Sequence, residues 1–264
     1  MGIGARGGPM NHLATAAAPR PKADAWFFPV MTAVVWLGVI MGFGGEMVRQ
    51  SRAGDLTYPL IVHIHALVFT GWLVVFTAQV VFIRQGRFGL HRTLGLAAMA
   101  LAGVMLVLGP ATALIVQVNR LGSPAADPAF LAVSMSDMIS FAGLVCAGFI
   151  NRAKGALHKR LMLLSTLALA DAGFGRWSFA LLGQSLQPVL GDGFACAFIT
   201  GCGFSALALL APMFLDLVMH RRISAGVAWA TAWAIGWLVV ATSLYPNPVW
   251  KALAGGLVAW LGGQ

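Results

Sequence analysis

The residues best suited to chemistry in this chain are histidines that open three similar basic turns between long apolar runs. These turns are His91-Arg92-Thr93-Leu94, His158-Lys159-Arg160-Leu161 and His220-Arg221-Arg222-Ile223. An imidazole can ligate a metal or a haem iron, and a neighbouring Arg or Lys can bind an anionic group. Two interpretations follow. Either His91 and His158 converge on one such ligand, or the turns contact lipid phosphates and act as cytoplasmic anchors, which their shallow depth favours.

A second group of candidates consists of ionisable side chains inside the apolar runs. Its members are His65, Asp137, Asp171 and Arg176. Counted at about 1.5 Å per residue, they share one layer at roughly 10 to 14 Å from the outer surface, with Asp171 nearer the middle. A charge in hydrocarbon costs about 2.5 to 3.5 kcal/mol, so these groups must face protein or a cavity. Two interpretations, which do not exclude each other, fit the layer: an Asp137 to Arg176 ion pair that fixes helix register, and a site for a proton, ion, cofactor or substrate. The layer is the stronger of the two site candidates.

The second apolar run carries two histidines, His63 and His65, whose spacing separates them. Residues two apart on a helix point in nearly opposite directions, so the two imidazoles cannot face one site. His65, Trp72 and Gln79 recur every seven residues, which keeps them on one stripe of the helix. We expect this stripe to face the bundle and His63 to face a groove or lipid.

The elements that position these residues are predicted to be membrane-spanning helices. Hydrophobic residues make up 59% of the 264 residues and charged residues 9%, a balance that excludes a water-soluble domain. Crossing a bilayer takes about 20 apolar residues in a helix, and the period-two alternation of barrel strands is missing. Seven runs are long enough: 26–43, 58–83, 92–118, 128–150, 159–182, 194–219 and 223–245. The predicted fold is an all-α polytopic transmembrane bundle over residues 26–245, followed by an interfacial or re-entrant apolar tail, 246–264.

The net charge of +9 is distributed in a way that indicates topology and argues against nucleic acid as a partner. Basic residues gather in alternate loops, and the loops between them are close to neutral. The basic loops hold Arg84, Arg87, Arg92, Arg152, Lys154, Lys159, Arg160, Arg221 and Arg222. By the positive-inside rule these loops and the amino terminus are cytoplasmic. Residues 1–25 are expected to form a disordered basic tail that contacts membrane lipid.

The basic turns also reveal an internal repeat. Aligning His91 with His158 superimposes residues 87–94 on residues 154–161, and each turn joins an outward-to-inward helix to an inward-to-outward one. Hairpins of one orientation are typical of a parallel repeat. The third hairpin fits less well, because its loop is shorter and Asp216 lies one turn before His220. We expect Asp216, His220 and Arg221 to contact head groups and the loop.

These motifs together resemble a family of bacterial polytopic inner-membrane proteins, of about seven helices, whose activity is not assigned. The resemblance covers the second to fifth predicted helices. It is carried by His63-Ile64-His65-Ala66, Trp72, Gln79, Gly86-Arg87, Leu90-His91-Arg92, Leu94-Gly95, Leu157-His158-Lys159-Arg160-Leu161-Met162 and Arg176. It implies a multi-pass protein of the cell inner membrane with histidine-basic turns before its helices.

Two classes of function fit the sequence. The first is a haem b-binding or quinone-linked electron-transfer protein that uses His65, His91 or His158 as ligands and Arg176 for a propionate. One observation argues against this class. Bundle cytochromes that stack two haems commonly repeat a histidine about four turns along one helix, but four turns after His65 the second helix has Gln79. The second class is a proton-coupled transporter, lipid handler or sensor that uses the layer of His65, Asp137, Asp171 and Arg176. No nucleophile has a base at motif spacing, which argues against hydrolytic enzymes. An electron-transfer or oligomeric partner is expected, but the sequence does not identify it.

Overall fold

The computed structural model describes residues 22–53 and 58–263, which fold into helices without any β-strand in these ranges. The elements are α1 (Lys22–Ala53), α2 (Leu60–Arg84), α3 (Phe88–Asn119), the short 3-10 helix η1 (Pro128–Phe130), α4 (Leu131–Ile150), α5 (Gly155–Leu190), α6 (Phe194–His220), α7 (Ala225–Leu244) and α8 (Pro248–Gly262). The predicted all-α bundle is confirmed. Most of the predicted tail, 1–25, lies outside the described residues, and residues 22–25 already belong to α1.

Within the described residues, six helices are long and apolar enough to cross a membrane, which marks the chain as a polytopic membrane protein. These are Ala25–Arg52 of α1, α2, α3, Pro128–Ile150, α6 and α7. The remaining predicted span, 159–182, falls in α5, which packs against α1, α4, α6 and α7. Leu163, Leu164 and Leu167 of α5 are completely buried. The polar residues in the middle of α5, such as Thr166 and Asp171, are buried among the other helices, and a seventh span stays a prediction.

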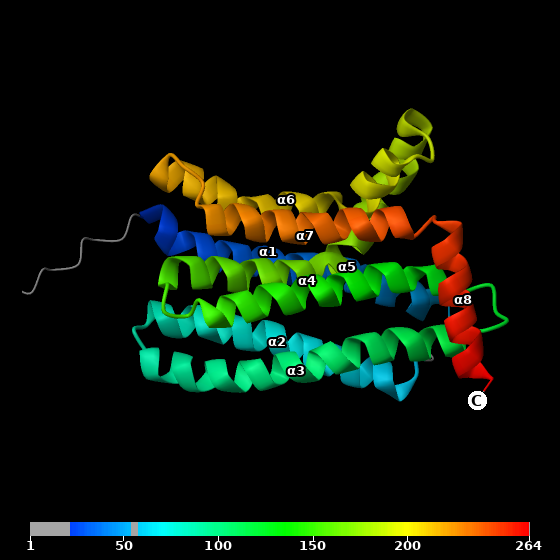
Figure 1. The fold of residues 1–264 in the computed structure, drawn as a ribbon, viewed down its shortest axis with the longest axis horizontal. Coiled ribbons are helices and arrows are strands. Elements are labelled where there is room, and N and C mark those ends of the chain that lie inside the picture. Colours follow the sequence, from blue (N-terminus) through cyan, green and yellow to red (C-terminus); the bar gives the residue numbers. More distant parts are fainter. Residues whose placement is uncertain (1–21, 54–57, 264) are drawn as a thin grey trace, which may run out of the picture.

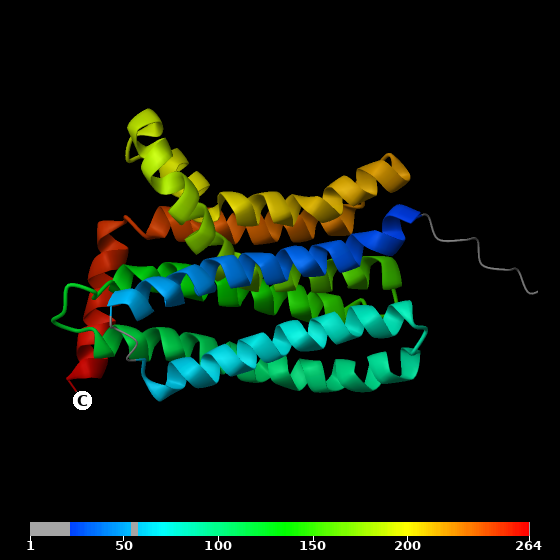
Figure 2. The same ribbon diagram turned by 180° about the vertical axis from the view of Figure 1, so that it is seen from behind.

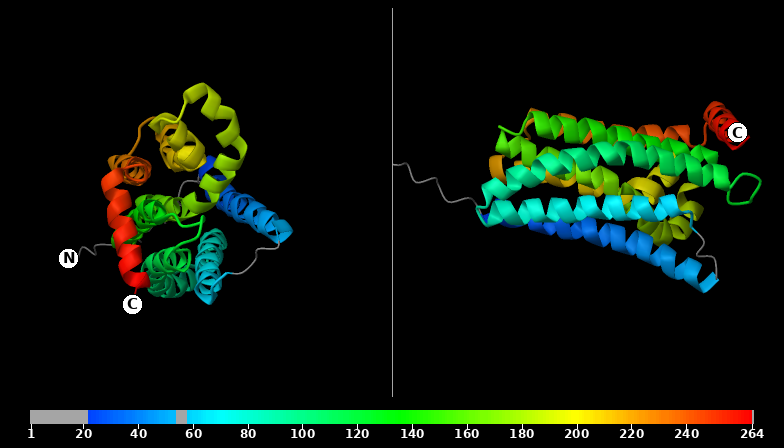
Figure 3. Two further views of the ribbon diagram at one scale, coloured as in Figure 1. Left: turned by 90° about the vertical axis from the view of Figure 1, so that its right-hand side faces the viewer. Right: turned by 90° about the horizontal axis from the view of Figure 1, so that it is seen from below.

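The helices lie side by side, with the turns of the three hairpins at one end of the bundle (Figures 1 and 2). The α2–α3, α4–α5 and α6–α7 turns all lie at the left of Figure 1, as the repeat predicts. We call this the basic end, because the three histidine-basic turns meet there. Helix α8 lies across the opposite end, where it packs against α3 and η1 (Figure 3). There the end of α5 and the beginning of α6 lean away from the other helices (Figure 1).

Helices α1 and α5 cross at glycines, so their backbones touch. A Cβ at Gly173 would lie 2.8 Å from the carbonyl oxygen of Gly38, and a Cβ at Gly42 would lie 2.7 Å from the Cα of Gly173. Real Cβ atoms essentially never come within 3.0 Å of a heavy atom from another helix. Gly38 and Gly42 form a G-x-x-x-G pair, the spacing that lets membrane helices approach closely. This contact holds α5 against the first helix.

A buried ion pair joins α5 to α6 near the basic end. Arg160 donates to Asp216 at 2.6 Å, and both side chains are almost fully buried. Asp216 also accepts a hydrogen bond of 3.0 Å from the backbone nitrogen of Ser224. The expected loop contact of Asp216 is therefore present, and its charged partner is Arg160. Sequence reasoning missed this partner because Arg160 and Asp216 lie 56 positions apart in the chain.

Candidate functional site

A cavity with a volume of about 1060 Å³ opens at the basic end. It lies among α1, α2, α3, α4 and α5, and much of its lining is aromatic or sulfur-containing. Its apolar wall includes Phe28, Trp72, Phe76, Met99, Phe149 and Met162. Ligand pockets commonly span about 300–1,000 Å³ and are mostly apolar with a few polar groups, so this cavity has the size and character of a site for a large apolar ligand.

Two histidines from neighbouring hairpins meet in the wall of this cavity. The rings of His91 on α3 and His158 on α5 have centroids 6.2 Å apart and planes at 83°. Sequence reasoning placed both residues before their helices, at the membrane surface. In the structure α3 begins at Phe88 and α5 at Gly155, so each histidine is already in the first turn and faces inward. The structure therefore brings together two of the predicted ligand residues.

The hydrogen bond of His158 defines which of its nitrogens is free. Its Nδ1 lies 2.8 Å from the carbonyl oxygen of Gly148. A carbonyl only accepts, so Nδ1 carries the proton and Nε2 of the neutral ring keeps its lone pair. Metal-ligating histidines are commonly oriented by such a bond from their other nitrogen to a backbone carbonyl. The hydrogen bond thus fixes the orientation of the His158 ring and leaves Nε2 as the nitrogen available to a metal.

Two buried polar atoms in this region have no hydrogen-bond partner among the described residues. They are Nδ1 of His91 and Oε1 of Gln79, and both residues line the cavity. Leaving a buried polar atom unpaired costs about 1–3 kcal/mol, so such atoms commonly mark a place where a ligand or water binds. Gln79 belongs to the seven-residue stripe, and Trp72 of the same stripe is 2% exposed, as expected for a bundle-facing side.

The separation of the two imidazoles matches axial ligation of one metal. A histidine nitrogen binds a metal at about 2 Å and lies about 1 Å from its ring centre, so rings on opposite sides of one metal have centroids about 6 Å apart. The observed value is 6.2 Å. The described ranges contain no group of three or more His, Cys, Asp or Glu side chains able to hold a bare metal ion.

Cationic side chains line the cavity beside the histidines. They are Arg84, Arg92, Arg152 and Lys159. Arg84 donates to the carbonyl oxygen of Ala25 and lies 4.8 Å from the ring centre of Trp26, which holds its guanidinium near the start of α1. Arg92 follows His91 directly and is exposed. Positive charge at the edge of an apolar cavity suits a ligand with a flat apolar body and carboxylate groups.

The predicted polar layer is only partly assembled. Asp137 on α4 and Asp171 on α5 are buried and interact electrostatically with each other and with Arg176. His65 is not part of this group, since its ring stacks on Phe69 with centroids 3.9 Å apart. Asp137 and Arg176 form no direct ion pair among the described residues, contrary to that interpretation of the layer. The layer thus consists of two carboxylates and a guanidinium, without the imidazole.

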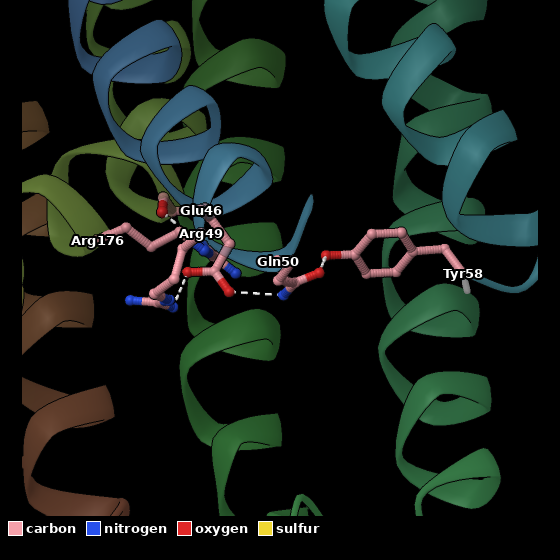
Figure 4. Close-up of polar contacts among 6 residues, drawn as sticks. Glu46, Arg49, Gln50, Tyr58 and Arg176 are labelled. Atoms are coloured by element: carbon pink, nitrogen blue, oxygen red, sulfur yellow. Dashed lines mark hydrogen bonds and ion pairs between the residues drawn. The ribbon is translucent and has the colours of Figure 1, made fainter. Parts of the chain in front are cut away.

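Arg176 reaches toward the end of α1, where a small polar network lies (Figure 4). It donates to the carbonyl oxygen of Ala172 at 2.5 Å, and its guanidinium lies 4.6 Å from the ring centre of Phe43. Glu46 accepts hydrogen bonds from Arg49 and from Gln50, the latter at 2.6 Å, and Gln50 accepts one from Tyr58. Arg176 is thus engaged far from the histidine pair.

His63 and His65 lie on different sides of α2, as their spacing predicts. His63 is exposed, with its Nδ1 3.3 Å from the carbonyl oxygen of Pro59 and its ring edge toward Tyr58. His65 is half-buried, and its Nδ1 has no partner among the described residues. His65 precedes Gln79 by 14 residues, or about 21 Å along the helix, so it cannot share a ligand with His91.

Comparison with protein-family models, with curated proteins and with solved structures found no match. The resemblance to the bacterial inner-membrane family therefore stays a prediction. The polytopic helical bundle itself is supported by the six apolar helices. Function must be argued from the geometry of the site.

Proposed function

We propose that this protein binds one haem b at the basic end, with His91 and His158 as its two axial ligands, and carries electrons within the membrane. The observation that carries the proposal is the pair of imidazoles, 6.2 Å apart in the wall of the cavity of about 1060 Å³. That separation is close to the about 6 Å expected for two rings on opposite sides of one iron.

The residues present fit this group. Gly148 holds His158 with Nε2 available, and Nδ1 of His91 makes no hydrogen bond among the described residues. Trp72 and Phe76 offer aromatic surface to a flat ring. A bis-histidine haem supplies reversible one-electron transfer, and its potential depends on hydrogen bonding and burial around it. In this protein the apolar wall would surround the flat ring, and His91 and His158 would hold the iron.

The propionate groups are assigned to Arg84 and Arg92, and not to Arg176. Both arginines line the cavity, whereas Arg176 lies with Glu46, Asp137 and Asp171. A guanidinium binds a carboxylate through paired hydrogen bonds, which favours arginine for this role. His65 is excluded as a ligand of this haem by its distance along α2.

The cellular setting follows from charge and composition. The basic end would face the cytoplasm by the positive-inside rule, and the protein would reside in the cell inner membrane. Its electron partner would be a quinone in the lipid or a second redox protein. A proton-coupled transporter is the second candidate, favoured by the two buried carboxylates Asp137 and Asp171.

The test is the reduced-minus-oxidised absorption spectrum of protein purified from cells supplied with haem. We expect a b-type band that is lost in His91→Ala and in His158→Ala. His65→Ala is the matched control, because it removes a half-buried imidazole far from the cavity and should leave the band unchanged. A colourless wild type, or a band that survives in both cavity variants, would overturn the proposal.

A second pair of variants separates loss of the cavity from loss of a ligand. A Cβ at Gly95 would meet only Gln79, at 3.5 Å, and Gly95 lines the cavity, so Gly95→Leu extends into the haem space. Gly103 lies on the same helix with nothing within 4 Å, so Gly103→Leu adds the same bulk elsewhere. We expect haem content to fall in Gly95→Leu and to be unchanged in Gly103→Leu. Equal haem content in the two variants would show that the ligand is not in this cavity.

A further inference from the structure

Two carboxylates lie inside the bundle, in a group that the proposed haem site does not use. Asp137 on α4 and Asp171 on α5 are 8% and 4% exposed, and they interact electrostatically. Ser205 on α6 lies beside Asp171. Three helices therefore contribute to one buried polar group near the middle of the bundle.

Two atoms of this group have unmet hydrogen-bonding capacity. Asp171 Oδ1 and the hydroxyl oxygen of Ser140 have no partner among the described residues, while the hydroxyl group of Ser205 lies near Asp171. All three side chains are at least 96% buried. Buried polar atoms are rarely left unpaired in folded proteins, because each costs about 1–3 kcal/mol. Oδ1 of Asp171 therefore lacks a hydrogen-bond donor, which a protonated carboxyl group or a ligand would supply.

The charges near the pair do not balance if every group is ionised. The interacting set holds the carboxylates of Glu46, Asp137 and Asp171, and the guanidiniums of Arg49 and Arg176. Glu46 is engaged by Arg49, which leaves Arg176 for both aspartates. Two carboxylates that share one cation in a low-dielectric interior do not both ionise readily, so one excess negative charge must be neutralised.

Among the described residues, Arg176 is the cation that interacts with the pair. Helix α7 has no ionisable side chain, and α6 contributes the thiol of Cys202. Asp216 of α6 and the residues His91 and Arg92 of α3 lie nearer the basic end and have other contacts. Asp216 pairs with Arg160, and His91 and Arg92 line the cavity. The described residues also lack a set of three or more ligands for a metal ion.

From this geometry we infer that Asp137 and Asp171 together bind one exchangeable proton, which makes the pair a proton-binding site within the membrane. A single proton removes the excess charge and gives one carboxyl group an O–H with which to donate. Arg176 balances the remaining negative charge. The site is independent of haem binding, since its residues lie outside the histidine cavity.

The test is labelling with dicyclohexylcarbodiimide, a lipid-soluble reagent that reacts with protonated carboxyl groups. Intact mass and peptide mapping of the detergent-solubilised full chain should show one adduct per chain, on Asp137 or Asp171, that declines as pH rises. Because the proton is shared, Asp137→Asn should abolish labelling of Asp171, and Asp171→Asn should abolish labelling of Asp137. Asp192→Asn, an exposed loop change, is the control and should label like the wild type.

Each other outcome contradicts the inference. An adduct elsewhere in the wild type, or none at low pH, would show that the pair holds no proton, even if the variants fail to fold. An adduct on Asp171 that persists in Asp137→Asn would show a proton on one residue alone. Protection of the wild type by sodium chloride at constant ionic strength would assign the site to a metal cation. None of these results depends on whether haem is bound.

Discussion

The glycine contact between α1 and α5 gives a sharp prediction about stability. Gly42→Ala places a Cβ that overlaps the carbonyl oxygen of Gly173 and lies 2.7 Å from its Cα. To reach ordinary contact at 3.4 Å, the backbone of α5 must move away from α1. Overpacking of a close contact costs about 1–3 kcal/mol, so we expect a loss of that size in the free energy of unfolding.

The matched control is Gly45→Ala on the same helix, where a Cβ would meet nothing within 4 Å. Both changes replace glycine by alanine inside a helix, a gain of up to about 1 kcal/mol that cancels in the comparison. Unfolding in mixed detergent micelles should show Gly42→Ala less stable than Gly45→Ala by about 1–3 kcal/mol. Gly173→Ala should have a similar effect, and the double variant should lose less than the sum. Equal stability of Gly42→Ala and Gly45→Ala would refute the close contact.

Two further predictions concern polar contacts. Arg160→Met and Asp216→Asn should each lower the free energy of unfolding by about 3–5 kcal/mol, because each leaves the other buried charge without its partner. In detergent unfolding, the double variant should recover much of this loss. Strictly additive losses would contradict the pairing. Tyr245 donates to Asp127 at 2.6 Å, and burial with the adjacent carboxylate raises the pKa of Tyr245 from 10.0 to about 12. Tyr245→Phe should therefore cost about 0.5 kcal/mol below pH 10, a small amount because the residue is 39% exposed, and this cost should vanish as pH rises through about 12. A difference in unfolding temperature that persists above that pH would contradict the assignment.

The bounds of a helix could be predicted where residues that favour a helix start and a helix end flank the apolar run. For α2, Pro59 precedes the first residue and Gly86, at φ +71°, follows the last, so the predicted 58–83 is close to Leu60–Arg84. For α1 the apolar run ends at residue 43, but the helix continues to Ala53. Glu46 bonds Arg49 and Gln50 at helical spacing there. Counting apolar residues cannot detect a helix that continues through its polar side chains.

The site could be predicted only in part, because tertiary packing decides which residues meet. The sequence identified His91 and His158 as related positions in a repeat, but their inward direction depends on where α3 and α5 begin. The G-x-x-x-G spacing of Gly38 and Gly42 was visible in the sequence, although it does not identify the partner helix. The partner of Asp216 could not be found locally, since Arg160 is 56 residues away.

The most direct test of the central proposal is the low-temperature electron paramagnetic resonance spectrum of the oxidised, haem-loaded protein. If His91 and His158 ligate one iron with rings at 83°, one low-spin ferric haem per chain should appear, with the strongly anisotropic signal of nearly perpendicular imidazoles. His158→Ala should abolish this low-spin signal. A high-spin ferric signal in the wild type, or no haem signal at all, would contradict bis-histidine haem binding at the basic end.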